Sequence, residues 1–247
     1  MTLRALIFDV DGTLADTEEA HRQAFNAAFI ELELWWDWGP ELYAQLLKVS
    51  GGKERIDHYL DTLRMTPAER ARARSLVPLV HATKTRIYKE LLERFRLPLR
   101  PGVAKLISDA RAAGVKLAIA STTTSANVGA LIDAALGRGA MRWFTTIAAG
   151  DVVENKKPAP DIYHRALQGL RLPAESCMAF EDSVNGLTSA AAAGLFTVVT
   201  PTRWNIGQPC GAAHLLLNTL EEVDLPMLGR LHADWLGQRH VSPAGGK

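Results

Sequence analysis

The sequence predicts an α/β fold, a doubly wound parallel sheet with a helical cap domain inserted near its start. Three observations predict it. A short apolar run at 5–8 stands alone at the N-terminus, and a long, mostly helical block follows it. From residue 99 onward, short apolar runs alternate with helical stretches, as in strands joined by crossover helices. We therefore expect residues 1–16 and 99–247 to form the core domain and residues 17–98 to form the cap.

Local signals account for the elements before residue 99. The run 5–8 ends at Asp9, which predicts a buried strand that delivers carboxylates at its carboxyl end. A helix should begin just after Asp16, because cap-type and acidic residues fill its first turn. Three tryptophans at 35–38 interrupt the helical spacing, which resumes at 42–47 and 56–63. We expect these tryptophans to pack inside the cap rather than to form a sugar-binding platform.

The segments after residue 99 alternate regularly. Helices are expected between Gly102 and Gly114, after residue 124, from about residue 161, and between Ser183 and Gly194, where Ser183 is a cap candidate and Gly194 a stop signal. Strands are expected at 115–120, 145–149, 178–180 and 196–199.

Composition and charge exclude several classes of protein. The chain has 28 Lys and Arg against 27 Asp and Glu, a net charge of +1, so no basic field indicates a nucleic-acid partner. Its two cysteines lack metal-ligand spacing, which excludes a disulfide scaffold and a cysteine-based zinc module. No apolar run approaches the roughly 18 residues of a membrane span, and Asp9 comes too early for a signal peptide. We expect a cytoplasmic monomer with no membrane partner.

Polar side chains follow four of the predicted strands. Because ligands of open α/β sheets bind beyond the carboxyl ends of the strands, these side chains should converge there. They are Asp9, Asp11, Ser121, Lys157, Glu181 and Asp182.

Their chemistry predicts a phosphoryl-transfer site. Clustered carboxylates repel one another unless a cation neutralises them, and oxygen ligands suit Mg²⁺. Lys157 and the Ser121 hydroxyl can hold a phosphoryl group. Asp9, two residues from Asp11, fits covalent transfer through an acyl phosphate. Each residue alone has an ordinary explanation as a turn, strand end, exposed charge or helix cap, but their order and placement together favour the site.

These residues resemble the motifs of the haloacid dehalogenase superfamily, over almost the whole chain. In order, the four motifs are Asp9-Val10-Asp11-Gly12-Thr13, Ser121, Lys157-Pro158 and Glu181-Asp182-Ser183. The helical block after the first motif is similar to that of members with a helical cap, including β-phosphoglucomutases and small sugar phosphatases. The resemblance implies a Rossmann-like core and a hydrolase.

The resemblance also implies catalytic roles. Asp9 should attack phosphorus and form an aspartyl-phosphate, while Asp11 acts first as general acid and then as general base. Mg²⁺ would be held by the Asp9 carboxylate, the Asp11 backbone carbonyl and Asp182, with Glu181 nearby or coordinating through water.

The phosphoryl oxygens would be bound by residues that follow the second and third motifs. Ser121 and Lys157 are expected to hold them, and the backbone N–H of Thr122 would add a donor.

Segments of the cap and of the core together resemble CbbY-type proteins, which dephosphorylate xylulose-1,5-bisphosphate. The shared segments are 51–56, 81–85, 121–124 and 156–163, with Ser121 where a threonine is expected. The cap would then recognise a sugar phosphate substrate: cations bind the far phosphate, glycines let backbone N–H groups approach it, and two polar side chains reach sugar hydroxyls. These residues are Lys53, Arg55 and Lys84, then Gly51 and Gly52, then Glu18 and His21.

Three alternatives stay open. A β-phosphoglucomutase-like mutase shares the aspartyl-phosphate but returns the phosphoryl group to a sugar. A phosphoglycolate-type phosphatase differs only in the leaving group. A non-catalytic phosphosugar-binding protein is less favoured, because a binder does not need both Asp9 and Asp11. Solvated surface charge is the plain alternative for the three cap cations.

Overall fold

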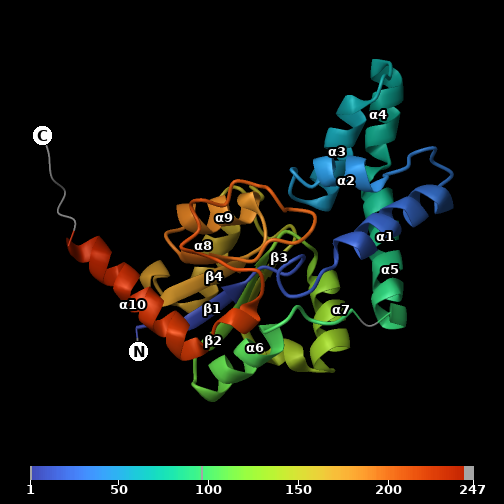
Figure 1. Ribbon diagram of the computed structural model, residues 1–247. Coiled ribbons are helices and arrows are strands. Elements are labelled where there is room, and N and C mark those ends of the chain that lie inside the picture. The colour runs from blue at the N-terminus through green and yellow to red at the C-terminus, as the bar shows by residue number, and fades with distance from the viewer. Residues whose placement is uncertain (1, 96, 242–247) are drawn as a thin grey trace, which may run out of the picture.

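The computed structural model describes residues 2–95 and 97–241, and a six-stranded sheet forms its centre (Figure 1). The strands lie in the order β3-β2-β1-β4-β5-β6, and every neighbouring pair is parallel. Their bounds are β1 Ala5–Phe8, β2 Lys116–Ser121, β3 Phe144–Ala149, β4 Cys177–Glu181, β5 Phe196–Val199 and β6 Leu215–Leu216. The predicted doubly wound sheet is confirmed. The sequence does not predict β6, because two residues are too few to show a period.

Helices cover both faces of the sheet. α6 (Val103–Ala112), α7 (Ser125–Leu136) and α10 (Leu225–Val241) pack on one face, against side chains such as Leu6 and Phe8. α8 (Asp161–Leu170) and α9 (Val184–Ala192) pack on the other, against Ala5 and Ile7. Successive side chains of a strand point to opposite faces, so a strand buried on both faces is apolar throughout. Short 3-10 turns lie at Ala140–Trp143, Ala174–Ser176 and Leu220–Glu222.

Five helices form the cap, which stands to one side of the sheet in Figure 1. They are α1 Glu18–Glu31, α2 Pro40–Leu46, α3 Gly52–Thr62, α4 Pro67–Ser75 and α5 Val77–Phe95. They enclose a separate apolar core, in which Trp38 packs against Phe25 and Phe29. Trp36 and Trp38 are buried in it, as expected, whereas Trp35 is 71% exposed.

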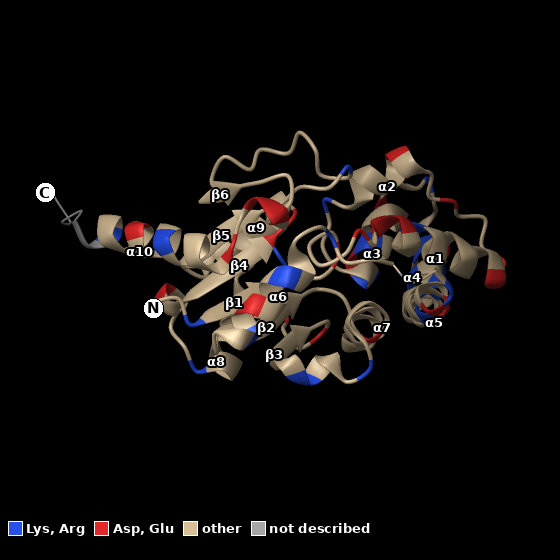
Figure 2. Cartoon of the chain, turned by 60° about the horizontal axis from the view of Figure 1, so that its bottom comes forward, with Lys and Arg blue, Asp and Glu red and all other residues tan. Residues whose placement is uncertain are grey.

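The chain crosses between core and cap twice, and the two crossings pair with each other. Ala15 forms an antiparallel bridge with Leu99, and the Arg100 N–H donates to the Leu14 carbonyl at 2.8 Å. Basic and acidic residues are interspersed over both parts of the chain (Figure 2). Among the described residues, no helix is long and apolar enough to span a bilayer.

Candidate active site

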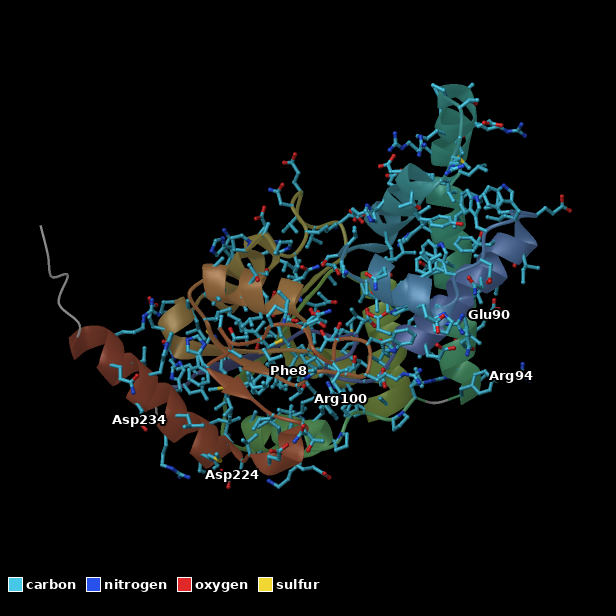
Figure 3. The ribbon with its side chains drawn as sticks, turned by 45° about the horizontal axis from the view of Figure 1, so that its top comes forward. Phe8, Glu90, Arg94, Arg100, Asp224 and Asp234 are labelled. Carbon is cyan, nitrogen blue, oxygen red and sulfur yellow. The ribbon has the colours of Figure 1, made fainter. Side chains whose placement is uncertain are left out.

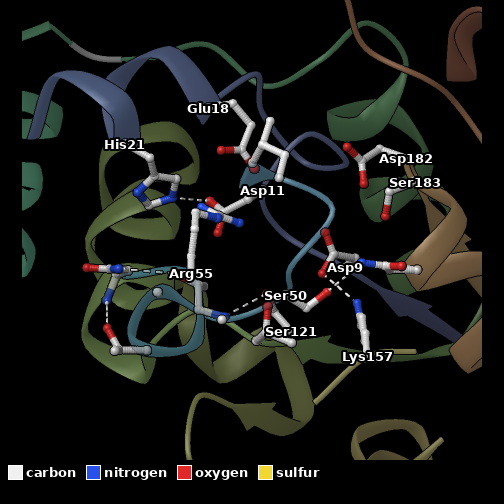
Figure 4. Close-up of a pocket in the computed structure, with 18 of the residues that line it drawn as sticks. Asp9, Asp11, Glu18, His21, Ser50, Arg55, Ser121, Lys157, Asp182 and Ser183 are labelled. Atoms are coloured by element: carbon white, nitrogen blue, oxygen red, sulfur yellow. Dashed lines mark hydrogen bonds and ion pairs between the residues drawn. The ribbon is translucent and has the colours of Figure 1, made fainter. Parts of the chain in front are cut away.

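A pocket between cap and core receives the residues that follow β1, β2 and β4. These strands are adjacent and parallel, so their carboxyl ends meet at one edge of the sheet. Figure 4 shows Asp9, Lys157, Asp182 and Ser183 on the core side of the pocket and Glu18, His21 and Arg55 on the cap side. Every predicted site residue except Lys53 lines this pocket. The lining members of that set are Asp9, Asp11, Glu18, His21, Gly51, Gly52, Arg55, Lys84, Ser121, Thr122, Lys157, Glu181 and Asp182.

Lys157 holds two of the core carboxylates together. Its Nζ donates to Asp9 Oδ1 at 2.7 Å and to Glu181 Oε1 at 2.5 Å, and the Tyr163 hydroxyl also donates to Glu181 Oε1. Burial raises the pKa of Asp9 to about 7, with Lys157 opposing the rise and Glu181 adding to it. Burial alone would lower the pKa of Lys157, but the two carboxylates outweigh it and raise that pKa. The Lys157 ammonium therefore stays charged beside the Asp9 carboxylate.

The third core carboxylate belongs to Asp182. Its Oδ2 accepts a hydrogen bond from Asn205 Nδ2, and burial, with the charges of Asp9 and Glu181, raises its pKa well above the ordinary value. Oxygen atoms of Asp9, Glu181 and Asp182 all lie within 4.8 Å of one another. Three buried oxygen donors that repel one another form a set suited to a hard divalent cation.

Asp11 faces the cap instead of the acidic cluster. Its Oδ1 accepts from Thr17 Oγ1 at 2.7 Å and contacts His21 Nε2 at 2.8 Å, and His21 Nδ1 lies 2.6 Å from Lys84 Nζ. An ammonium can only donate, so His21 accepts from Lys84 and donates to Asp11. Burial alone would raise the pKa of Asp11, but attraction to His21 and the hydrogen bonds from His21 and Thr17 bring it well below its ordinary value.

These contacts change two expectations for the cap. Both ring nitrogens of His21 are used on protein partners, so neither is free for a sugar hydroxyl in this arrangement. Lys84 is 4% exposed and donates to His21, which in turn donates to Asp11. Its charge therefore helps to lower the pKa of Asp11, besides lining the pocket. Glu18 keeps its pocket position and accepts from the Tyr43 hydroxyl at 2.8 Å through Oε2.

A hydroxyl-rich turn follows β2. Ser121 Oγ accepts from the Thr123 N–H at 3.3 Å, and Thr124 caps α7 by accepting from the Asn127 N–H at 3.2 Å. Thr122, Thr123 and Asn127 also line the pocket. The N-terminus of a helix favours an anion, so this turn is suited to phosphoryl oxygens.

The cap side of the pocket carries Arg55 and two glycines. Gly51 has φ +94°, which favours glycine, and Gly52 lies so close to His81 that a Cβ there would come within 2.7 Å of its ring. Arg55 is held by the Val49 carbonyl at 3.3 Å and the Tyr43 hydroxyl at 3.2 Å.

Lys53 is the predicted residue that the structure places elsewhere. Its Nζ donates to Asp151 Oδ2 at 2.7 Å, and Asp151 Oδ1 accepts from Lys156 at 2.7 Å. Asp151 lies in the loop after β3, so the ion pair joins the cap to the core outside the pocket lining. The attraction of this carboxylate, which the linear sequence does not reveal, turns Lys53 away.

Sequence reasoning missed several pocket residues. Asn185 donates to the Lys48 carbonyl at 2.8 Å and to Ser50 Oγ at 3.2 Å, which joins core to cap. Burial, together with the nearby charge of Lys84, lowers the pKa of His81 to about 4. Asn205 comes from the loop after β5. Of these, only Asn185, three residues after Glu181-Asp182, stands close enough to a motif to have been found from the sequence.

The sequence of this chain is similar to those of known proteins. The family model of haloacid dehalogenase-like hydrolases matches residues 3–194. CbbY from a Cupriavidus necator plasmid is 50% identical over 225 residues, which cover 91% of this chain and 89% of that protein. CbbY of Rhodobacter capsulatus is 52% identical over 213 residues, covering 86% of this chain and 92% of that protein.

A solved structure is similar over nearly the same length. It is the crystal structure of a mutant CbbY from Rhodobacter sphaeroides in complex with xylulose-(1,5)bisphosphate. The TM-score is 0.84 with 42% sequence identity, and the match covers 92% of this chain and 99% of that one.

Proposed function

Because this chain belongs to the haloacid dehalogenase-like hydrolases, we propose that it is a Mg²⁺-dependent phosphatase of a sugar bisphosphate. The preferred substrate is proposed to be xylulose-1,5-bisphosphate. One observation carries the proposal: a single pocket is lined by anion-binding groups from both core and cap. Lys157 and Ser121 line it from the core, and Arg55 and Lys84 line it from the cap. The CbbY neighbour that holds xylulose-(1,5)bisphosphate supports this substrate.

Asp9 is the proposed nucleophile. One of its carboxylate oxygens accepts from Lys157, which leaves the other for in-line attack on phosphorus. The attack forms an aspartyl-phosphate and releases the sugar hydroxyl. Lys157, Ser121 and the turn after β2 would hold the phosphoryl oxygens as negative charge moves onto them.

Asp11 is the proposed general acid and base. Because His21 and Thr17 keep Asp11 ionised in the pocket without substrate, Asp11 would first take up a proton when the substrate binds. It would donate that proton to the leaving sugar oxygen and then remove one from the water that hydrolyses the aspartyl-phosphate. The residues that hold its carboxylate, Thr17 and His21, lie at the start of the cap segment. Closure of the cap would thus align Asp11 while excluding bulk water.

Asp9 and Asp182 would hold Mg²⁺, with the Asp11 backbone carbonyl. Glu181 Oε1 already accepts from Lys157 and Tyr163, so Glu181 would contribute its other oxygen or bind through water. When bound, the ion neutralises charge on the carboxylates and on the phosphoryl oxygens.

The test is phosphate release from four substrates: xylulose-1,5-bisphosphate, ribulose-1,5-bisphosphate, phosphoglycolate and β-glucose 1-phosphate, each with and without Mg²⁺. We expect a preference for xylulose-1,5-bisphosphate. Asp9→Asn should lower kcat by on the order of 10⁴-fold or more, because it removes the nucleophile. Asp109→Asn, in an exposed pair with Lys105, is the matched control and should leave kcat unchanged.

Each other outcome contradicts a defined part of the proposal. Release from monophosphates alone would remove the far-phosphate role of the cap. Conversion of β-glucose 1-phosphate without phosphate release would indicate a mutase. Tight binding of a sugar phosphate without turnover would indicate a binding protein.

A further inference from the structure

Arg100 lies outside the pocket, where the second crossing enters the core, and its guanidinium contacts three separate loops. Nη1 donates to the Gly12 carbonyl and to the carbonyl and hydroxyl of Thr200, at 2.6 and 3.0 Å for the last two. Nη2 donates to the Pro201 carbonyl at 3.1 Å and the Asn218 carbonyl at 3.4 Å. Figure 3 shows Arg100 near the middle of the molecule.

Two of these loops carry the proposed machinery. Gly12 directly follows Asp11 and has φ +82°, and a Cβ on it would overlap Asp182 Oδ2. The backbone of Gly12 therefore lies against the Asp182 carboxylate. Thr200 and Pro201 begin the loop that carries Asn205, which donates to the same carboxylate.

We propose that Arg100 is a positioning residue for the reaction. By joining Gly12 to Thr200 and Pro201, it sets the Asp11 loop relative to Asp182 and Asn205. The expected effect on catalysis rests on the proposed function, whereas the joining of the loops rests on the hydrogen bonds alone. A guanidinium carries five N–H donors in a fixed plane and stays charged when half-buried, whereas a lysine ammonium has three donors on one nitrogen and cannot reproduce the contacts of Nη1 and Nη2 together.

The backbone of the crossing does not depend on this side chain. The Ala15–Leu99 bridge and the Arg100 N–H bond to the Leu14 carbonyl hold the crossing segments together. Removal of the guanidinium should therefore disturb the loops at 10–13 and 200–205 more than the path of the chain.

The experiment compares Arg100→Ala and Arg100→Lys with Arg94→Ala, an exposed arginine at the end of α5 (Figure 3). We expect kcat on the best substrate to fall by about 10- to 100-fold in both Arg100 variants, as for a small misplacement of reacting groups, with KM changed less than about threefold. Guanidinium ion, far below denaturing concentrations, should restore part of kcat in Arg100→Ala, and methylammonium should not. Arg94→Ala should behave as wild type.

Amide hydrogen exchange separates this inference from the proposed function. Exchange should rise at 10–13 and 200–205 in the Arg100 variants and stay unchanged in the sheet. If the wild type turns over no substrate, the proposed function fails while the exchange result still tests the role of Arg100. Wild-type kcat in Arg100→Ala, equal losses in Arg94→Ala, or unchanged exchange in both loops would overturn the inference. If Arg100→Ala does not fold, Arg100→Lys supplies the same measurements.

Discussion

Lys84 places an ammonium in the wall of the pocket, 4.9 Å from the centre of the Phe25 ring and 5.0 Å from that of Tyr88. Burial lowers the pKa of Lys84 to about 8, although the charge of Asp11 opposes the change. A buried charge of this kind opposes folding. Under the proposed function, its contact with His21, which donates to Asp11, gives a reason for keeping this charge.

The pKa of Lys84 predicts how stability depends on pH. Between about pH 8 and 10.5 this lysine binds a proton in the unfolded chain but not in the folded one, so its contribution makes the free energy of unfolding rise with pH. From pH 8 to 9.5 the rise should be about 1–2 kcal/mol, because the folded-state lysine is still half protonated at pH 8. Urea denaturation of wild type and Lys84→Met at both pH values measures it.

Wild type and Lys84→Met share all other groups that titrate in this range, so the difference between the two proteins isolates the contribution of Lys84. Lys84→Met should lack the rise and should be the more stable protein at pH 7.5, because an apolar side chain replaces a buried charge. If the free energy of unfolding changes with pH by the same amount in both proteins, the lowered pKa of Lys84 is wrong.

At the scale of elements, the α4 helix shows how local sequence forms the cap. Thr66 Oγ1 accepts from the Glu69 N–H at 3.3 Å, and Glu69 Oε2 accepts from the Thr66 N–H at 2.8 Å, which is a capping box. Pro67 follows as the first helical residue, where its missing N–H costs nothing. No α4 residue lines the pocket.

Loss of this capping box should therefore lower the stability of the protein without changing catalysis. Thr66→Ala should lower the free energy of unfolding by about 1 kcal/mol, because it leaves N–H groups of the first turn without a partner. Chemical denaturation measures the loss, and Thr66→Ser, which keeps the hydroxyl, is the control. A changed KM for the sugar phosphate would show that α4 reaches the site.

Across the whole molecule, the segment 48–53 is attached to the core at both ends. Asn185 binds the Lys48 carbonyl and Ser50, and Asp151 binds Lys53. The Lys53–Asp151 pair is partly exposed, and pairs of this kind contribute about 0.2–1 kcal/mol. It is a weak contact, but it joins the two parts that line the pocket.

A double-mutant cycle distinguishes this contact from a phosphate ligand. Lys53→Met and Asp151→Asn should each raise KM by up to about fivefold at low salt, and the double variant should be no worse than either. The single-variant effects should shrink at high ionic strength. If Lys53 binds the far phosphate instead, Lys53→Met will raise KM just as much when Asp151 is already Asn.

The strand ends and the core motifs were predictable for a local reason. An apolar run followed by a carboxylate is visible within five residues, as in 5–9, and parallel strands bring such ends together. The contacts of Lys53, His21 and Asn205 were not predictable. Each depends on a partner from another part of the chain, with Asp151 98 residues beyond Lys53.

Sequence patterns alone predicted the parallel sheet, the inserted helices and the convergence of six residues, which the structure places in one pocket: Asp9, Asp11, Ser121, Lys157, Glu181 and Asp182. Periodicity and strand-end position are local properties of the sequence, and the parallel sheet brings the residues at the strand ends close together. The folded structure was needed to show that Asp11 is bonded to the cap, that Lys53 pairs with the core and that Arg100 joins three loops. A long polar side chain takes the direction of the charges and carbonyls that surround it, and folding brings those groups from distant parts of the chain.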